Sequence, residues 1–284
     1  MRQPDDLNWD DLRLFAVVAE CKSFRQAAER LGLTHPTVRR RIEALESALG
    51  LRLFHRRQAG LHLSVEGAEL VASSRDVERA VLDVLRRAES IDRDLKGPLR
   101  VTMPTELMPA IAPALAAFQN RWPAIELRIE TGARLADLAR SEADVAVRGY
   151  RQGRQPPEHL AGRKAVTGSA AVYGDARVSP YWIGSLGDPP RSGWTATQAY
   201  AGLPIRAVIA NVVARHAACA AGMGIAMMPC IVGDVDLTRL TEPAEDFDIW
   251  VLVHPDLRAN PRLRLFRDEM VDALVSIEDA LRGS

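Results

Sequence analysis

The sequence predicts a two-domain protein of the α+β class. Three observations support this prediction. Helical stretches joined by a glycine turn occupy residues 9–49, a heptad-like apolar repeat covers residues 70–95, and strands alternate with helices from residue 97 onward. A helix pair with a tight turn and a long alternation of strands and helices are typical of different architectures, so we expect a small N-terminal domain, a long helix and a larger C-terminal α/β domain.

Composition is that of a globular protein. The 284 residues are 47% hydrophobic and 26% charged, and they contain no run of about 18 apolar residues that would predict a membrane span. The acidic, polar start MRQPDDLNWDDL does not resemble a secretory signal. Three widely spaced cysteines without a CxxC motif argue against disulfides and a zinc site. We therefore expect a cytoplasmic protein without membrane contact, metal or cofactor.

The N-terminal 50 residues predict a helix-turn-helix. Ser23 and Thr34 are placed as N-caps, Gly32 supplies the turn, and Pro36 lies in a first helical turn, where its missing N–H is tolerated. Apolar residues recur at helical spacing along both stretches and mark the core-facing stripe. These residues are Leu12, Phe15, Ala16, Ala19, Ala27, Ala28, Leu31, Val38, Ile42, Leu45 and Leu49.

Charge is balanced over the chain, 37 basic against 37 acidic residues, but residues 22–57 hold nine basic and three acidic residues, a local net charge of +6. This asymmetry predicts a polyanion-binding face, with a merely solvated basic surface as the alternative. In a helix-turn-helix the second helix enters the DNA major groove. The buried stripe leaves His35, Thr37, Arg39 and Arg40 pointing outward, whereas Arg41 is expected to cover the helix flank.

A hairpin is expected directly after the second helix of the pair. LRLFHRRQAGLHLSVEG, residues 51–67, alternates apolar and polar residues around Gly60, which is typical of two strands. Arg56 and Arg57 fall at its base, where they suit the phosphates beside the minor groove. The predicted N-terminal fold is thus a winged helix-turn-helix.

Residues 9–67 resemble the N-terminal domain of LysR-type transcriptional regulators. Phe15 and Val18, the run SFRQAAERLGLTHPTVRRRIEALESALGLRLFHR and the segment LSVEG match the family pattern. Arg39 stands where the family usually has serine, and Ser64 stands for the wing's usual threonine, keeping a hydroxyl for phosphate. The resemblance implies that the DNA-binding residues are Ser23, Arg25, Thr34, Pro36, Thr37, Arg39, Arg40 and Arg56.

The next segment predicts a dimerisation helix. Leu70, Ser74, Val77, Val81, Val84, Ala88, Ile91 and Leu95 alternate steps of four and three residues, which is the seam of a coiled coil. The alternative is a helix packed on its own chain. The resemblance implies a linker helix that forms homodimers, and commonly homotetramers.

The C-terminal segment predicts a parallel sheet with helices. Strands are expected at residues 99–103, 125–131, 144–149, 169–175, 181–185, 205–210, 224–229 and 249–255, and helices at 105–121, 134–141, 212–221 and 263–281. GMGIAMMP and VLVHPDLRANPRLRLFRDEM resemble the family's effector domain. That resemblance implies a type 2 periplasmic-binding-protein-like fold of two Rossmann-like subdomains.

These patterns set the expected domain boundaries. The winged helix-turn-helix covers residues 1–67, the linker helix 68–96 and the regulatory domain 97–284. Within the regulatory domain, the first subdomain covers about 97–160 and 250–284, and the second about 161–249.

An enzyme is not expected. The six histidines are scattered, and the sequence holds no HExxH motif, no GxSxG nucleophile elbow, no complete dinucleotide fingerprint and no phosphate loop.

Ligand sensing is the expected role of the C-terminal domain. Ligands of open α/β sheets bind at the carboxyl ends of strands, where this sequence has Thr102, Thr105, Thr131 and Arg148. Thr105 is expected to cap a helix whose N-terminal amides favour an anion, Thr195 lies across the cleft, and Arg148 would be the counter-charge of a small carboxylate. The alternative is that the threonines only cap and that Arg148 pairs with an acid such as Asp144.

We therefore expect a regulator that binds double-stranded promoter DNA and responds to a small-molecule effector, with RNA polymerase as a candidate partner. The alternative is an effector-independent repressor whose C-terminal domain serves oligomerisation alone.

Overall fold

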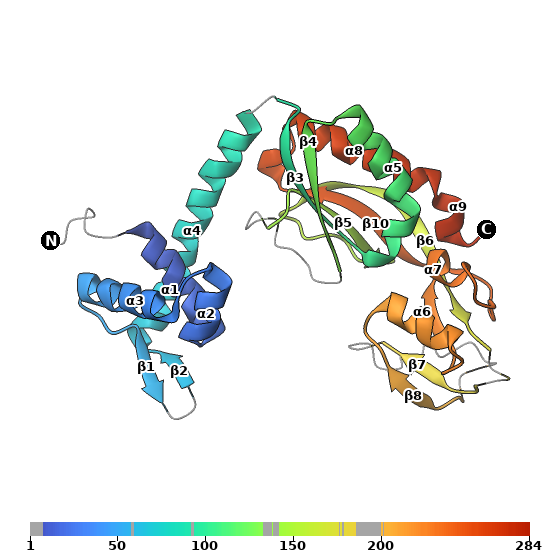
Figure 1. Cartoon of the computed structure of the whole chain (residues 1–284), viewed down its shortest axis with the longest axis horizontal. Coiled ribbons are helices and arrows are strands. Elements are labelled where there is room, and N and C mark those ends of the chain that lie inside the picture. Colours follow the sequence, from blue (N-terminus) through green and yellow to red (C-terminus); the bar gives the residue numbers. More distant parts are fainter. Residues whose placement is uncertain are drawn as a thin grey trace. The chain divides into compact units, whose positions relative to one another are not determined.

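The structure, a computed structural model, describes residues 8–57, 60–91, 94–132, 138, 142–175, 177, 179–185, 200 and 202–284 (Figure 1). The chain divides into two compact units, Met1–Arg86 and Arg87–Ser284.

Three helices form the body of the N-terminal unit. They are α1 (Trp9–Cys21), α2 (Phe24–Leu31) and α3 (His35–Leu49). Asn8, Ser23 and Thr34 cap their N-termini, and Gly32 and Gly50 end α2 and α3 in the left-handed conformation. Most of the expected apolar stripe is buried, with Phe15, Val38 and Ile42 at most 2% exposed, and its remaining residues, Leu12, Ala19, Leu31 and Leu49, are partly buried against the same core. The predicted helix-turn-helix is therefore confirmed.

The wing is a two-stranded antiparallel hairpin. Strand β1 (Phe54–Arg57) pairs with β2 (Gly60–Leu63), with Phe54 opposite Leu63. Phe54 packs edge-on against both Phe15 and Phe24, at ring-centroid distances of 5.5 and 6.0 Å. These contacts fix the base of the wing to the same core that holds the helices.

Helix α4 (Val65–Ile91) follows the wing and runs into the second unit. Leu70 and Val71, in its first half, pack on the core of the N-terminal unit. Further along, Val77 and Val84 are 36% and 66% exposed. The helix starts five residues before the expected heptad, because Val65, directly after the buried Ser64, is already helical. It ends before Leu95, the last position of the expected heptad.

One six-stranded sheet organises the C-terminal unit. Its order is β4-β3-β5-β10-β6-β9, from β3 (Gly97–Met103), β4 (Ile125–Thr131), β5 (Val145–Arg151), β6 (Ala161–Tyr173), β9 (Ala226–Pro229) and β10 (Ala244–Val253). Strands β4, β3 and β5 are parallel, but β10 is antiparallel to both β5 and β6, and β6 is antiparallel to β9. The expectation of a parallel sheet is confirmed for β4, β3 and β5 and is wrong for β10, β6 and β9. The long strands β6 and β10 lie side by side in opposite directions, a pairing that the sequence pattern does not contain.

Helices α5 (Met108–Arg121) and α8 (Pro261–Ser276) pack together over one face of this sheet (Figure 1). Phe118 and Phe266 meet edge to face between them, with ring centroids 5.2 Å apart. The short 3-10 helix η2 (Thr105–Leu107) leads into α5. The face toward α5 and α8 holds the main core of this unit.

A smaller layer lies beyond the shared strands β6 and β9. It contains the parallel strands β7 (Trp182–Gly184) and β8 (Ile205–Val208) and the helices α6 (Val212–Ala220) and α7 (Cys230–Gly233). Ile183, Ala218 and Met228 are among its buried residues. The predicted helix at 134–141 lies almost wholly outside the described residues.

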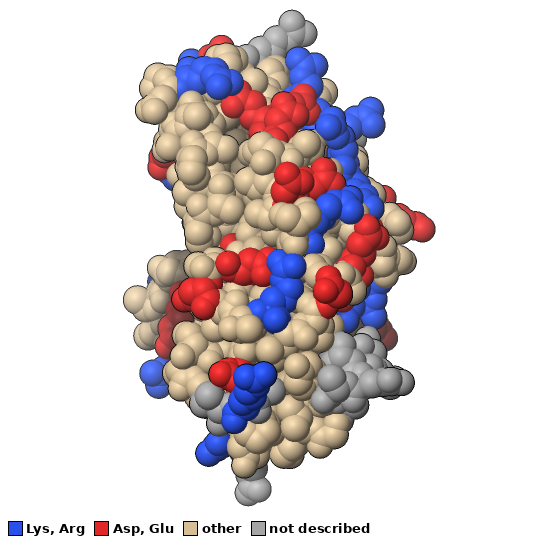
Figure 2. Space-filling view, turned by 90° about the vertical axis from the view of Figure 1, so that its right-hand side faces the viewer, with Lys and Arg blue, Asp and Glu red and all other residues tan. Residues whose placement is uncertain are grey.

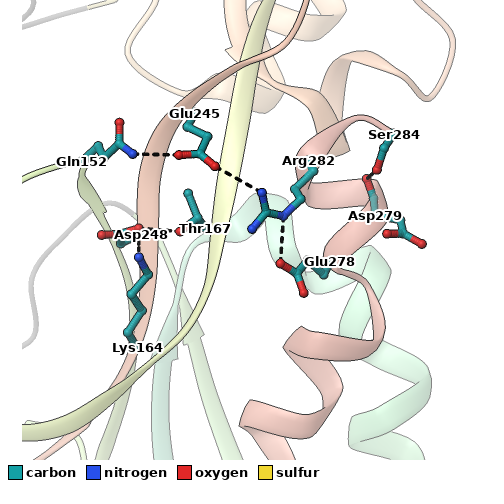
Figure 3. A network of polar contacts seen from close by, with 9 residues as sticks. All are labelled: Gln152, Lys164, Thr167, Glu245, Asp248, Glu278, Asp279, Arg282 and Ser284. Carbon is teal, nitrogen blue, oxygen red and sulfur yellow. Dashed lines mark hydrogen bonds and ion pairs between the residues drawn. The ribbon is translucent and has the colours of Figure 1, made fainter.

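The last helix, α9 (Glu278–Arg282), is tied to the sheet by a polar network (Figure 3). Glu245 on β10 accepts hydrogen bonds from Gln152 at 2.8 Å and from Arg282 at 3.2 Å, and Arg282 also binds Glu278 at 2.8 Å. These bonds fix α9 to strand β10 of the sheet. Among the described helices, none is both long and apolar enough to cross a membrane.

Candidate nucleic-acid interface and ligand cavity

The N-cap of α3 and its buried apolar stripe determine which side of the helix faces solvent. Thr34 Oγ1 accepts the N–H of Thr37 at 3.4 Å, and Pro36 lies in the first turn. Val38, Ile42 and Leu45 are buried, so the opposite side of the helix is exposed. The outward residues expected from the sequence, His35, Arg39 and Arg40, are exposed, and Thr37 is half-buried.

The three consecutive arginines of α3 occupy three different environments. Successive residues of an α-helix are about 100° apart, so these side chains cannot share one direction. Arg41 turns toward α1 and binds Asp10, at 2.7 Å, and Asp11. Arg39 turns the other way and binds Glu43 at 2.8 Å. Arg40, between them, is exposed and has no partner among the described residues.

The contact of Arg41 with α1 is electrostatically favourable. Burial alone raises the pKa of the Asp10 carboxyl, but hydrogen bonds from Arg41 and Arg13 outweigh this effect and hold the pKa below its ordinary value. The Arg41 side chain is 23% exposed. Arg41 therefore joins α3 to α1, in agreement with the expectation that it covers the helix flank.

The other expected DNA-facing residues divide between caps and exposed groups. Ser23 and Thr34 use their hydroxyls as N-caps, and Thr37 shares a 2.8 Å hydrogen bond with Thr34. Arg25 is 85% exposed beside Glu29, at 3.3 Å. Pro36 is exposed. Arg56 and Arg57 lie on β1 in register with Leu61 and Gly60, so they are at the turn end of the hairpin and not at its base, as was expected. Their side chains are outside the described part of the chain.

The hydroxyl of Ser64 is not available for phosphate, which corrects the sequence-based expectation. Ser64 is 4% exposed, its Oγ donates to the Arg52 carbonyl, and it accepts the N–H of Gly67 at 2.8 Å. It is therefore the N-cap of α4. The side chain serves the junction of wing and linker helix.

Glu46 is a residue of the candidate site that the sequence reasoning missed. Its Oε1 accepts the N–H groups of Leu53, at 2.7 Å, and Phe54, at 3.2 Å. The carboxylate thus fixes the first residues of the wing relative to α3. The acidic pair Asp10 and Asp11 was also missed as a partner of Arg41, because the sequence shows these acids but not which side chain they contact.

Basic and acidic side chains lie interspersed on the face that Figure 2 shows. This mixture agrees with the neutral formal charge of the whole chain and contrasts with the excess of six basic residues between positions 22 and 57.

In the C-terminal unit, two of the expected ligand residues meet. Arg148 is 6% exposed and Thr102 is 2% exposed, and Arg148 Nη2 donates to Thr102 Oγ1 at 2.7 Å. Burial lowers the pKa of the Arg148 guanidinium, and the charges of Tyr150 and Glu130 oppose this effect. Asp144 binds Arg100 instead, at 2.9 Å, so the acid whose charge acts on Arg148 is Glu130 and not Asp144.

The remaining three expected ligand residues do not join them. Thr131 is in register with Met103, which faces the main core, so it lies on the opposite face of the sheet from Thr102. Thr105 is not a helix cap, because η2 precedes α5 and Leu107 occupies the N-cap position without a side-chain hydrogen bond. Thr195 lies outside the described residues.

A cavity of about 210 Å³ opens between η2, α6 and the strands β6, β7 and β9. Its apolar wall includes Ile183, Val212, Met227 and Met228, and its charged residues are Glu106, Arg151, Arg215 and Asp246. Arg215 is 9% exposed and donates to the carbonyls of Ile209 and Ala210. None of the four described threonine and arginine candidates is among the residues that line this cavity.

Two family models match the chain. One, described as a bacterial regulatory helix-turn-helix protein of the lysR family, matches residues 9–68, and the other, described as a LysR substrate binding domain, matches residues 92–172. The chain belongs to the LysR family. The family fold, with an N-terminal helix-turn-helix and a C-terminal domain built on a mixed sheet, agrees with the two-domain class expected from the sequence.

Curated transcriptional regulators match part of the chain. A helix-turn-helix-type transcriptional regulator of Xanthomonas campestris is 34% identical over 185 residues, which are 65% of this chain and 51% of that protein. The glycine cleavage system transcriptional activator of Escherichia coli is 33% identical over 137 residues, 48% of this chain and 44% of the activator. The chain thus spans about half the length of these relatives.

The fold extends over nearly the whole chain in a solved structure. The full-length virulence activator AphB of Vibrio cholerae superposes with a TM-score of 0.55 at 22% identity and covers 94% of this chain and 99% of AphB. At this identity the similarity shows a shared fold.

Proposed function

We propose that the chain is a sequence-specific transcriptional regulator that binds double-stranded promoter DNA in the cytoplasm. The observation that supports this most directly is α3, an N-capped helix with a buried stripe on one side and the unpaired, exposed Arg40 on the other. Recognition helices insert their N-terminal residues into the major groove, and arginine donates two hydrogen bonds to guanine there. The family is one of regulators, in line with the expectation that the chain is not an enzyme.

Dimerisation through α4 is part of the proposal. Val77 and Val84 lie on the expected coiled-coil seam and are exposed in the single chain, whereas Leu70 is covered by the core of its own unit. Burial of apolar seam residues against a second copy would stabilise the pair and place two α3 helices on neighbouring half-sites. A tetramer would join two such pairs.

The C-terminal unit is proposed to bind a small-molecule effector. The cavity between η2 and α6 combines an apolar wall with groups of both charges, as small-ligand sites do. Arg148 binds Thr102 inside the sheet and does not line this cavity, so we do not assign it as the counter-charge of an effector there. An effector changes DNA binding only if it has different affinities for two conformations of the regulator. RNA polymerase is then the partner whose access changes.

The DNA-binding proposal is tested by allowing the full chain to select fragments of genomic DNA over a range of salt concentrations. We expect a recurrent inverted repeat, with an affinity that falls steeply as salt rises because counterions are released. Arg40→Ala is expected to lose discrimination between sites as well as affinity. Absence of any recurrent sequence in the wild-type selection would refute the proposal.

The effector proposal is tested by filling the cavity. Met227 lines it, so Met227→Trp is expected to abolish the response of promoter occupancy to growth conditions while DNA binding is kept. Met223→Trp is the matched control, since Met223 is 43% exposed and does not line the cavity. A response that is unchanged in Met227→Trp would favour the effector-independent alternative.

A further inference from the structure

The ion pair between Arg39 and Glu43 lies on the DNA-facing side of α3. The two residues are one helical turn apart, with Arg39 Nε 2.8 Å from Glu43 Oε1 and side chains 54% and 57% exposed. Glu43 is thus an exposed carboxylate on the helix that is expected to approach phosphates. A carboxylate in that place repels a polyanion.

Helix stability gives little reason for this acid. Exposed ion pairs contribute little to stability, and the order found here, arginine before glutamate, is the less favourable one along a helix. Glu46, the next acid of α3, holds the wing through Leu53 and Phe54. Glu43 has no such bond, and its only partner among the described residues is Arg39.

The ion pair leaves the two terminal nitrogens of the Arg39 guanidinium available to donate hydrogen bonds. Of the five N–H donors of a guanidinium, only the one on Nε is used, so both terminal nitrogens lack a partner among the described residues. Two parallel donors match O6 and N7 of guanine in the major groove. A guanidinium held at Nε keeps this pair of donors in one orientation, whereas an unrestrained arginine can turn to a phosphate.

We propose that Glu43 is a specificity-determining, positioning residue, which holds Arg39 so that its terminal nitrogens donate to a guanine instead of a phosphate. This inference rests on the proposed DNA-binding function. It gives the acid on α3 a role in base discrimination, exerted through Arg39. Arg40, which is exposed and has no partner among the described residues, does not depend on Glu43.

The test is Glu43→Gln in the full chain, assayed on the site that the wild type selects and on every single-base-pair variant of it. We expect discrimination at one G·C pair to fall at least about fivefold, because a bidentate arginine contact separates bases by roughly 5- to 150-fold. Affinity for unrelated DNA should rise, with a slope against salt steeper by about one unit, as the released arginine reaches a phosphate.

Two further variants separate positioning from a general charge effect. Glu29→Gln removes the same charge from the same unit and breaks an equivalent pair with Arg25, four residues apart at 3.3 Å. It should change affinity equally for all sequences. In an Arg39→Ala background, Glu43→Gln should no longer alter discrimination, which shows that the effect passes through Arg39.

The outcomes distinguish this inference from the proposed function. Loss of discrimination in Glu43→Gln, absent without Arg39, supports the inference. An unchanged base preference in Glu43→Gln, beside a wild type that selects a clear site, overturns the inference and leaves the proposed function standing. A wild type that selects no sequence overturns both.

Discussion

Replacement of Gly67 by alanine is predicted to destabilise the protein, although the same replacement usually stabilises a helix. Gly67 is the third residue of α4, where replacement of glycine by alanine normally stabilises a helix by about 1 kcal/mol. Here a Cβ would lie 2.3 Å from the Leu53 carbonyl oxygen and 3.1 Å from Ser64 Oγ. Because the nearest atom belongs to the backbone, relief requires that the base of the wing and the start of α4 move apart.

The magnitude follows from the bonds at this junction. The Leu53 carbonyl accepts the Ser64 N–H at 2.9 Å, and the Leu53 N–H donates to Glu46 at 2.7 Å. Overpacking costs about 1–3 kcal/mol, and each weakened hydrogen bond about 1 kcal/mol. After the gain in helix propensity, Gly67→Ala should destabilise the junction by about 2 kcal/mol, which corresponds to a roughly 30-fold larger equilibrium constant for local opening.

Hydrogen exchange of the full chain, followed by mass spectrometry, measures this opening directly. Peptides that cover residues 53–57 and the first turns of α4 should exchange faster in Gly67→Ala, and peptides of the C-terminal unit should not change. Ser73→Ala, at an exposed position of the same helix, is the control and should not accelerate exchange. Slower or equal exchange in Gly67→Ala would refute the argument from close approach.

Three further predictions concern Arg41, the cysteines and α4. Arg41→Gln should destabilise the N-terminal unit by about 1–2 kcal/mol in urea unfolding. Since the folded pKa of Asp10 is depressed, this difference should be present above about pH 4 and shrink as the pH falls through the folded pKa. Burial raises the pKa of Cys219 to about 11, so iodoacetamide should label it more slowly than the half-buried Cys21, as judged by peptide mapping. Val84→Glu should shift sedimentation toward monomer, whereas Ala72→Glu, off the seam, should not.

Local chemistry made the N-terminal domain predictable. The stripe Val38, Ile42 and Leu45, the Thr34 cap and the Gly32 turn each depend on residues within a few positions, and the structure confirms all of them. What the sequence could not show is long-range pairing. Arg41 meets Asp10 across 31 positions, and nothing in either segment alone marks that contact.

The C-terminal unit was less predictable for the same reason. The first half of β6 reads AGRKAVTG, with glycines and charges that do not indicate a strand, and it becomes one because β10 lies beside it. The antiparallel direction of β10 is likewise a property of tertiary pairing. The ligand residues were inferred from strand ends, but register places Thr131 and Thr102 on opposite faces of the sheet.

The three arginines of α3 are expected to have unequal roles in DNA binding, and a single measurement tests this. Arg39→Ala, Arg40→Ala and Arg41→Ala are compared in the full chain for binding to the selected site and to its single-base-pair variants. We predict that the first two each lose discrimination at distinct positions, by roughly 5- to 150-fold, because each removes a base contact. Arg41→Ala should keep the wild-type base preferences and lose only stability. Equal loss of discrimination in all three variants, or none in Arg40→Ala, would contradict the account.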